Sequence, residues 1–164
     1  MFNQLVSFSV QYLYVVIAVI AVVFLVSKSY TKKRSILPLA LLSSGIAFVL
    51  DKVLNVIIYN PRPFVVENIS PLVPHMADNG FPSEHTLFAM LIAGIIFVLH
   101  KKMGILLGTL ALIVGIGSVL AKVHHPIDVL GSVLIAFVSV LVSTFIISRF
   151  GNRGVSTSRF DNTP

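Results

Sequence analysis

Long apolar runs alternate with short polar stretches along most of this chain. A helix that crosses a bilayer needs about 20 mostly apolar residues. Five segments have, or nearly have, that length and composition: 10–27, 36–59, 83–100, 103–122 and 126–148. The pattern therefore predicts an all-α fold, a polytopic transmembrane bundle of about five spanning helices.

The two chain ends differ in character. Residues 1–10 contain no Lys or Arg, and the apolar run that follows is longer than the core of about 7–15 residues in a signal peptide, so we expect a retained helix. Residues 151–164 are polar and rich in small side chains, which is typical of a flexible tail. We expect a single transmembrane domain over residues 1–150, followed by that tail.

The composition agrees with lipid as the solvent of most side chains. Of the 164 residues, 56% are hydrophobic and 11% are charged, whereas about 25% of residues are charged in an average soluble protein. The absence of cysteine excludes a disulfide framework and a thiolate metal site. The net charge of +6 is less informative than the placement of the basic residues, and we expect no nucleic-acid partner.

The basic residues are distributed unequally between the two sides of the predicted bundle. Nine of the 12 follow the first, third and fifth segments: Lys28, Lys32, Lys33, Arg34, Lys101, Lys102, Arg149, Arg153 and Arg159. Cytoplasmic connections carry the excess of Lys and Arg in membrane proteins. The amino terminus is therefore predicted to lie outside, and the tail in the cytoplasm.

The opposite side, predicted to be extracytoplasmic, carries the unusual polar residues. The 60–82 connection is long for a loop inside a bundle and holds five of the eight prolines, which favours a functional role. Four of the five histidines also fall on this side: His75, His85, His124 and His125. The candidate chemistry lies in three short stretches at the helix ends, 60–63, 82–85 and 124–128.

Three groups in these stretches suit phosphate chemistry. Arg62, fixed between two prolines, offers a planar fork of donors that fits a phosphate. Ser83 is expected to cap the third helix, whose first N–H groups form an anion site beside His85. Asp128 falls in the first turn of the fifth helix and is in reach of His124. A carboxylate on one imidazole nitrogen leaves the other nitrogen as an acceptor or nucleophile.

Each group also has a purely structural interpretation. The arginine can anchor the protein to lipid headgroups, the serine can be a simple helix cap with an interfacial histidine nearby, and the His–Asp pair can stabilise a helix start. Their joint occurrence on one side of the membrane favours function. Together they supply charge stabilisation, a nucleophile and an acid for a leaving oxygen, which are the requirements of phosphoryl transfer.

Residues 51–132 resemble the type-2 phosphatidic acid phosphatase superfamily of membrane lipid phosphatases. The family motifs Lys-x6-Arg-Pro, Pro-Ser-x-His and Ser-Arg-x5-His-x3-Asp correspond here to residues 55–63, 82–85 and 117–128. The stretches 61–65 and 128–132 look especially like bacterial undecaprenyl pyrophosphate phosphatases of the bacitracin-resistance type. This resemblance implies a bacterial plasma membrane and a helical membrane bundle.

The resemblance also implies roles for individual residues. His124 would attack the terminal phosphorus to form a phosphohistidine, Asp128 would orient it, and His85 would protonate the leaving oxygen. The groups implied to hold the phosphoryl oxygens are Arg62, Ser83 and nearby backbone N–H groups such as that of Glu84. The resemblance implies neither a cofactor nor a metal.

Two phosphate-binding cations of the family motifs are absent from this sequence. The lysine of the first motif is Asn55 here, and the arginine of the third motif is Ser118. Lys52 lies one turn before Asn55 and Lys122 one turn after Ser118, so our hypothesis is that the two lysines compensate. The alternative is that Lys52 pairs with Asp51 or snorkels to the interface, and that Lys122 only ends the fourth helix.

The leading prediction is hydrolysis of a lipid (pyro)phosphate at the outer membrane face, with undecaprenyl pyrophosphate cleaved to undecaprenyl phosphate and phosphate. The alternatives are a phosphatidylglycerophosphate or phosphatidic acid phosphatase, a catalytically weakened lipid-phosphate-binding relative, and a metal-dependent hydrolase built on the outer histidines and carboxylates. A transporter would use Asp51, Lys52 and Asn55. These residues lie at one end of a single helix, which disfavours transport. The pattern predicts no particular oligomeric state.

Overall fold

A computed structural model describes residues 1–27 and 30–150 of the chain. Its helices are α1 (Phe2–Gln11), α2 (Leu13–Val26), α3 (Tyr30–Ile57), α4 (Pro63–Val66), α5 (Glu84–Leu99), α6 (Lys101–Leu120) and α7 (Pro126–Phe150). The described residues contain no strand beyond one isolated bridge, so the predicted all-α class is confirmed. The predicted tail, residues 151–164, lies outside the described residues.

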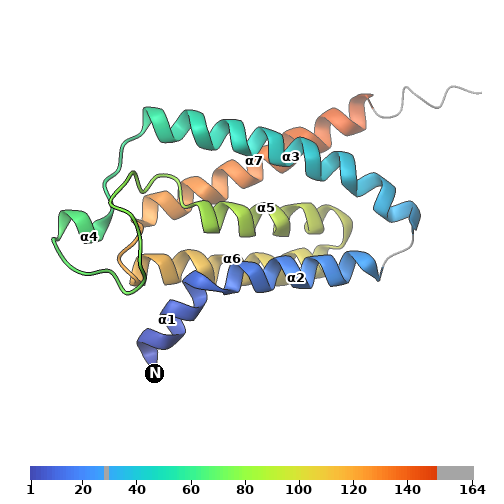
Figure 1. Ribbon diagram of the computed structural model, residues 1–164. Helices are drawn as coiled ribbons and strands as arrows, with labels where there is room; N and C mark the ends of the chain where they lie inside the picture. The colour runs from blue at the N-terminus through green and yellow to red at the C-terminus, as the bar shows by residue number, and fades with distance from the viewer. Residues whose placement is uncertain (28–29, 151–164) are drawn as a thin grey trace, which may run out of the picture.

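The long helices form a bundle with α5 at its centre (Figure 1). α5 packs against α6, α7, α2 and α3. One apolar cluster joins it to α2 and α6 through Ile17, Ile96 and Leu107. A second cluster joins it to α3 and α7 through Leu91 and Ile135, among others. A helix that is apolar around most of its circumference is stable only when neighbours cover it on several sides, as they do here.

The first predicted span is broken into two helices. α1 and α2 meet at Tyr12 with a bend of 53°. The bend turns α1 out of the line of α2 and against the end of α6 (Figure 1), where Ser9 approaches Gly117. Even a Cβ atom at Gly117 would collide with the Ser9 hydroxyl, so a glycine is required for this close approach.

Within the described ranges, three helices are long and apolar enough to cross a membrane: α3 from Ile36, α6 and α7. The bent α1–α2 pair is a fourth candidate span. α5 coincides with the third predicted segment, 83–100, but has only 16 residues, fewer than the about 20 of an independent span. Figure 1 shows its first turn set back from the ends of α3 and α7, because the chain enters the bundle before α5 begins.

The outward faces of the bundle are apolar. Large side chains such as Val22, Leu134 and Phe145 are more than half exposed. An exposed apolar surface that extends over several helices marks a membrane-facing region. The chain is thus an integral membrane protein.

Candidate active site

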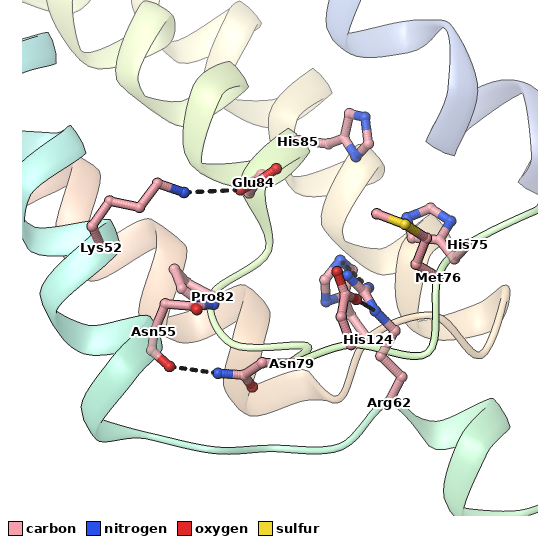
Figure 2. Close-up of a pocket in the computed structure, with 11 residues that line it drawn as sticks. Lys52, Asn55, Arg62, His75, Met76, Asn79, Pro82, Glu84, His85 and His124 are labelled. Carbon is pink, nitrogen blue, oxygen red and sulfur yellow. Dashed lines mark hydrogen bonds and ion pairs between the residues drawn. The ribbon is translucent and has the colours of Figure 1, made fainter.

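Most of the predicted site residues gather at one end of the bundle, which we call the pocket end. Here α3 ends, α5 and α7 begin, and the loops 58–83 and 121–125 connect them. A pocket of about 360 Å³ opens between these elements. Six of the ten predicted site residues line it: Lys52, Asn55, Arg62, Glu84, His85 and His124 (Figure 2).

The hydrogen bonds of His124 determine its tautomer. Its Nε2 lies 3.2 Å from Arg62 Nη1, and its Nδ1 lies 2.9 Å from the Gly80 carbonyl oxygen. A guanidinium can only donate and a carbonyl can only accept, so Nδ1 carries the proton and Nε2 carries the lone pair. The buried imidazole therefore presents an unprotonated nitrogen to the arginine of the pocket.

Asp128 fixes the surroundings of His124. Its carboxylate is completely buried and accepts hydrogen bonds from Asn60 Nδ2 at 2.6 Å and from the His125 backbone N–H at 2.7 Å. Its Oδ2 lies 3.4 Å from His124 Nδ1. The predicted His–Asp pair is present, and the Gly80 carbonyl is a closer partner of the same nitrogen. These bonds stabilise a carboxylate that burial would otherwise destabilise.

Arg62 is positioned by three partners. Its Nε donates to Asp78 Oδ1 at 2.8 Å, and its Nη1 donates to the Val123 carbonyl at 3.0 Å besides contacting His124. Only 9% of the residue is exposed. The short helix α4 begins with Pro63 directly after it, which fixes the backbone as the sequence predicted. The guanidinium is therefore held next to the unprotonated Nε2 of His124.

The two predicted residues at the start of α5 have different surroundings. His85 lines the pocket and packs its ring on that of Tyr14 from α2, with centroids 4.4 Å apart. Ser83 is completely buried and does not line the pocket; its hydroxyl lies 3.0 Å from Thr86 Oγ1 and makes no helix-capping bond. Its carbonyl accepts a hydrogen bond from Ser132 of α7. The expected capping serine thus occupies the N-cap position but joins α5 to α7.

Asn55 stands where the first family motif has a lysine. Its side chain connects the loop before α5 to the end of α3. Its Nδ2 donates to the Phe81 carbonyl at 2.6 Å. The Asn79 amide in return donates to the carbonyls of Asn55 and Ile58. Figure 2 draws the bond between Asn79 and Asn55, and together these bonds hold the loop before α5 against the end of α3.

Lys52 extends into the same pocket from one turn earlier on α3. Its ammonium lies 2.9 Å from Asp51 Oδ2 and 3.4 Å from Glu84 Oε1. Figure 2 shows it on the α3 side of the pocket, across from the histidines. Lys52 therefore pairs with Asp51, as the alternative interpretation expected, and its side chain also lines the pocket. Compensation for the lost motif lysine stays a prediction.

Ser118 and Lys122 do not line the pocket. Ser118 is buried, its hydroxyl donates to the Gly115 carbonyl, and its own carbonyl accepts from the N–H groups of Val123 and His124. Lys122 follows the end of α6 in a left-handed conformation (φ 62°) and pairs with Glu67 at 2.9 Å. The structure does not bring the second replacement lysine to the site.

His75, which belongs to none of the three motif stretches, also lines the pocket. Its ring lies 6.2 Å from those of both His85 and His124. Burial, and then the nearby Arg62 guanidinium, lower the pKa of His75 from its ordinary value. The signal in the sequence that could have assigned His75 to the site was its position among the four histidines on the predicted outer side. No set of three or more His, Cys, Asp or Glu side chains in the described ranges is arranged to hold a metal ion.

Comparison with known proteins identifies the family. The model of the PAP2 superfamily matches residues 8–151. The chain belongs to the PAP2 superfamily. This result confirms the resemblance found in the three motifs, and with it the class of lipid phosphatase.

Curated relatives of this PAP2 chain include two from Bacillus. The bacitracin transport permease protein BcrC of Bacillus licheniformis is 34% identical over 142 residues, which are 86% of this chain and 70% of the relative. The undecaprenyl-diphosphatase BcrC of Bacillus subtilis (strain 168) is 35% identical over 96 residues, covering 58% of this chain and 50% of the relative. The putative undecaprenyl-diphosphatase YbjG of Escherichia coli (strain K12) is 34% identical over 94 residues, covering 56% and 47%. The last two alignments span about half of each relative's length.

A solved structure supports the fold of the PAP2 chain. The crystal structure of Aquifex aeolicus LpxE superposes with a TM-score of 0.67, covering 88% of this chain and 83% of that one. The sequence identity is 23%, so the likeness concerns the helical architecture alone.

Proposed function

We propose that this protein removes the terminal phosphate from a lipid diphosphate, converting undecaprenyl diphosphate to undecaprenyl phosphate and inorganic phosphate. Two of the curated relatives bear names of undecaprenyl-diphosphatases. The observation that carries the proposal is the arrangement of His124, whose Nε2 lone pair faces Arg62 while Nδ1 is held by Gly80 and Asp128. This is the form in which an imidazole acts as a nucleophile.

The proposed reaction proceeds in two displacements. His124 Nε2 attacks the terminal phosphorus, a nitrogen–phosphorus bond forms, and the bond from phosphorus to the bridging oxygen breaks. His85 gives its proton to that oxygen as the lipid monophosphate leaves. Water then attacks the phosphohistidine, His85 takes up a proton from it, and phosphate is released with His124 restored. Asp128 keeps the ring oriented in both steps.

The charges of the pocket fit this reaction. Arg62 would exchange its contact with Nε2 for the phosphoryl oxygens, where the negative charge of the transition state develops. Lys52 supplies the second cation of the pocket in place of the motif lysine. The backbone N–H groups of the first turn of α5, including that of Glu84, complete the proposed anion site.

The site is proposed to face the extracytoplasmic side of the bacterial plasma membrane. The connections at the opposite end of the bundle carry the excess of basic residues, such as Lys101, Lys102 and Arg149. The lipid substrate would reach the pocket from the outer leaflet, with its hydrocarbon chain among the membrane lipids.

The test is phosphate release from undecaprenyl diphosphate by purified protein in detergent, with a chelator present. We expect release by the natural chain and by His100→Asn, and none by His124→Asn. His100 caps α6 at the far end of the bundle, and asparagine is also a good capping residue, so this variant is the matched control. Trapping an acid-labile phosphate on the natural chain would support the covalent step. Release that stops in chelator and returns with added metal would support the metal-dependent alternative.

A second candidate function is that of a lipid-phosphate-binding relative with weak catalysis. It is favoured by the position of Lys122, which pairs with Glu67 and leaves the arginine of the third motif without a replacement in the pocket. Binding of several lipid phosphates without release of phosphate from any of them would support this function.

A further inference from the structure

We propose that His75 is the centre of a second phosphate subsite, which holds the phosphate that stays on the lipid when a diphosphate is cleaved. The inference rests on the proposed function and identifies the part of the pocket that distinguishes diphosphates from monophosphates. The pocket is larger than a single phosphate group requires. A volume of 360 Å³ corresponds to about twelve water molecules at roughly 30 Å³ each, which is more space than one phosphate group fills.

His75 lies where the second phosphate must be. In the proposed reaction the terminal phosphorus is next to His124, and the bridging oxygen is next to His85. The remaining phosphate is bonded to that oxygen, so it lies near both histidines. The His75 ring is 6.2 Å from each of their rings, and it stands nearly edge-on to both, with interplanar angles of 67° and 81°. Figure 2 shows His75 on the same side of the pocket as His85 and His124.

The imidazole of His75 has an unfilled bonding capacity. Its Nδ1 is buried and has no partner with hydrogen-bond geometry. Because Nδ1 is closed off from the pocket, the ring nitrogen that can meet a ligand there is Nε2, which has no hydrogen-bond partner in the part of the chain that the structure describes. The oxygens of a phosphate are suitable acceptors for the single N–H of a neutral imidazole.

The loop holds His75 in a defined place. On one side, Val73 is buried in an apolar cluster with Val6, Val10 and Val123. On the other side, Asp78 bonds Arg62, and Asn79 bonds the end of α3. The residues that flank His75 are thus fixed to three parts of the bundle. A ring held in this way loses little conformational entropy when it binds a ligand.

The first experiment compares two lipids with the same polyprenyl chain, one a diphosphate and one a monophosphate. For His75→Asn we expect kcat/KM to fall roughly tenfold or more with the diphosphate, as for a lost hydrogen bond to a charged group, and less than about twofold with the monophosphate. The control His100→Asn should change neither value. An equal fall with both lipids, or no fall with the diphosphate, would overturn the proposal.

The second experiment separates the subsite from catalysis. The His124→Ala variant cannot form the phosphohistidine, so binding of inorganic pyrophosphate and of inorganic phosphate can be measured directly by calorimetry. We expect pyrophosphate to bind more tightly than phosphate, and the added change His75→Asn to remove that preference while phosphate binding persists. Persistence of phosphate binding would also show that the variant is folded. An unchanged preference would contradict the subsite, even if the natural chain were found to cleave no lipid.

Discussion

Asn55 and Ser118 stand at the two positions where the family motifs have a cation. Each has a lysine one turn away in sequence, but the surroundings of the two positions differ. Lys52 lies within α3, three residues before Asn55, and both side chains line the pocket. Lys122 lies two residues after the end of α6, in a left-handed conformation, and its side chain pairs with Glu67 instead. The rule that residues three or four apart share a helix face applies only while the helix continues. A helix end therefore decides which lysine can replace a lost cation.

The two substituted positions also hold different parts of the site. Asn55 ties the loop before α5 to the end of α3 through its side chain. Ser118 holds the loop before α7 through its backbone carbonyl, which accepts from Val123 and His124. The first position depends on the identity of its side chain, whereas the second does not. This difference can be tested by substitution, beginning with the one motif cation that remains.

The largest effect is expected at Arg62. In Arg62→Lys the ammonium cannot replace a fork that bonds Asp78, Val123 and His124 together. With both other motif cations lost, we expect kcat/KM for the lipid diphosphate to fall about a hundredfold or more. Arg149→Lys, at the far end of α7, is the control and should leave the rate unchanged. A fall of less than threefold in Arg62→Lys would show that Lys52 carries the charge stabilisation instead.

A smaller effect is expected at Lys52. In Lys52→Met the pocket loses its second cation, and we expect kcat/KM to fall roughly tenfold, the effect of one charge-assisted bond. Lys52→Arg keeps the charge and should retain most of the activity. Phosphate release from the lipid diphosphate measures both variants. Full activity of Lys52→Met would mean that Lys52 only forms ion pairs with Asp51 and Glu84. The proposed functional difference between Lys52 and Lys122 would then be wrong.

The substituted positions themselves should differ in stability by a modest amount. Asn55→Ala leaves the Phe81 carbonyl without its 2.6 Å partner and should lower the free energy of unfolding by about 1 kcal/mol. In Ser118→Ala the lost hydroxyl bonded only a carbonyl of its own helix, so we expect a change of less than about 0.5 kcal/mol. Thermal unfolding in detergent compares the two variants directly. Equal losses would contradict the difference between side-chain and backbone roles.

The smallest effect is expected at Lys122. Its ion pair with Glu67 is about half exposed on both sides, and such pairs contribute less than about 1 kcal/mol. Lys122→Met should therefore change kcat/KM less than about twofold and stability only slightly. Activity assays run beside Lys52→Met provide the sharpest contrast. A tenfold loss of activity would place this lysine at the substrate after all.

The sequence by itself determined the membrane class, the helical segments and three of the groups at the pocket. Apolar runs of sufficient length leave a helix as the solution in lipid, because each backbone polar group must be satisfied within the segment. The motif spacings placed Arg62, His85 and His124 at helix ends on one side, and the structure brings these side chains to one pocket. The family comparison then confirmed the phosphatase class.

The tertiary structure decided what spacing along one chain does not contain. The 53° bend at Tyr12 places α1 against the end of α6, and Ser83 is buried where the start of α5 bonds to Ser132 of α7. The place of His75 depends on a loop whose anchors lie on several separate elements. The direction of Lys122 depends on where α6 stops. Each is set by contacts between segments distant in sequence, so local periodicity predicts the helices but not the side chains that meet between them.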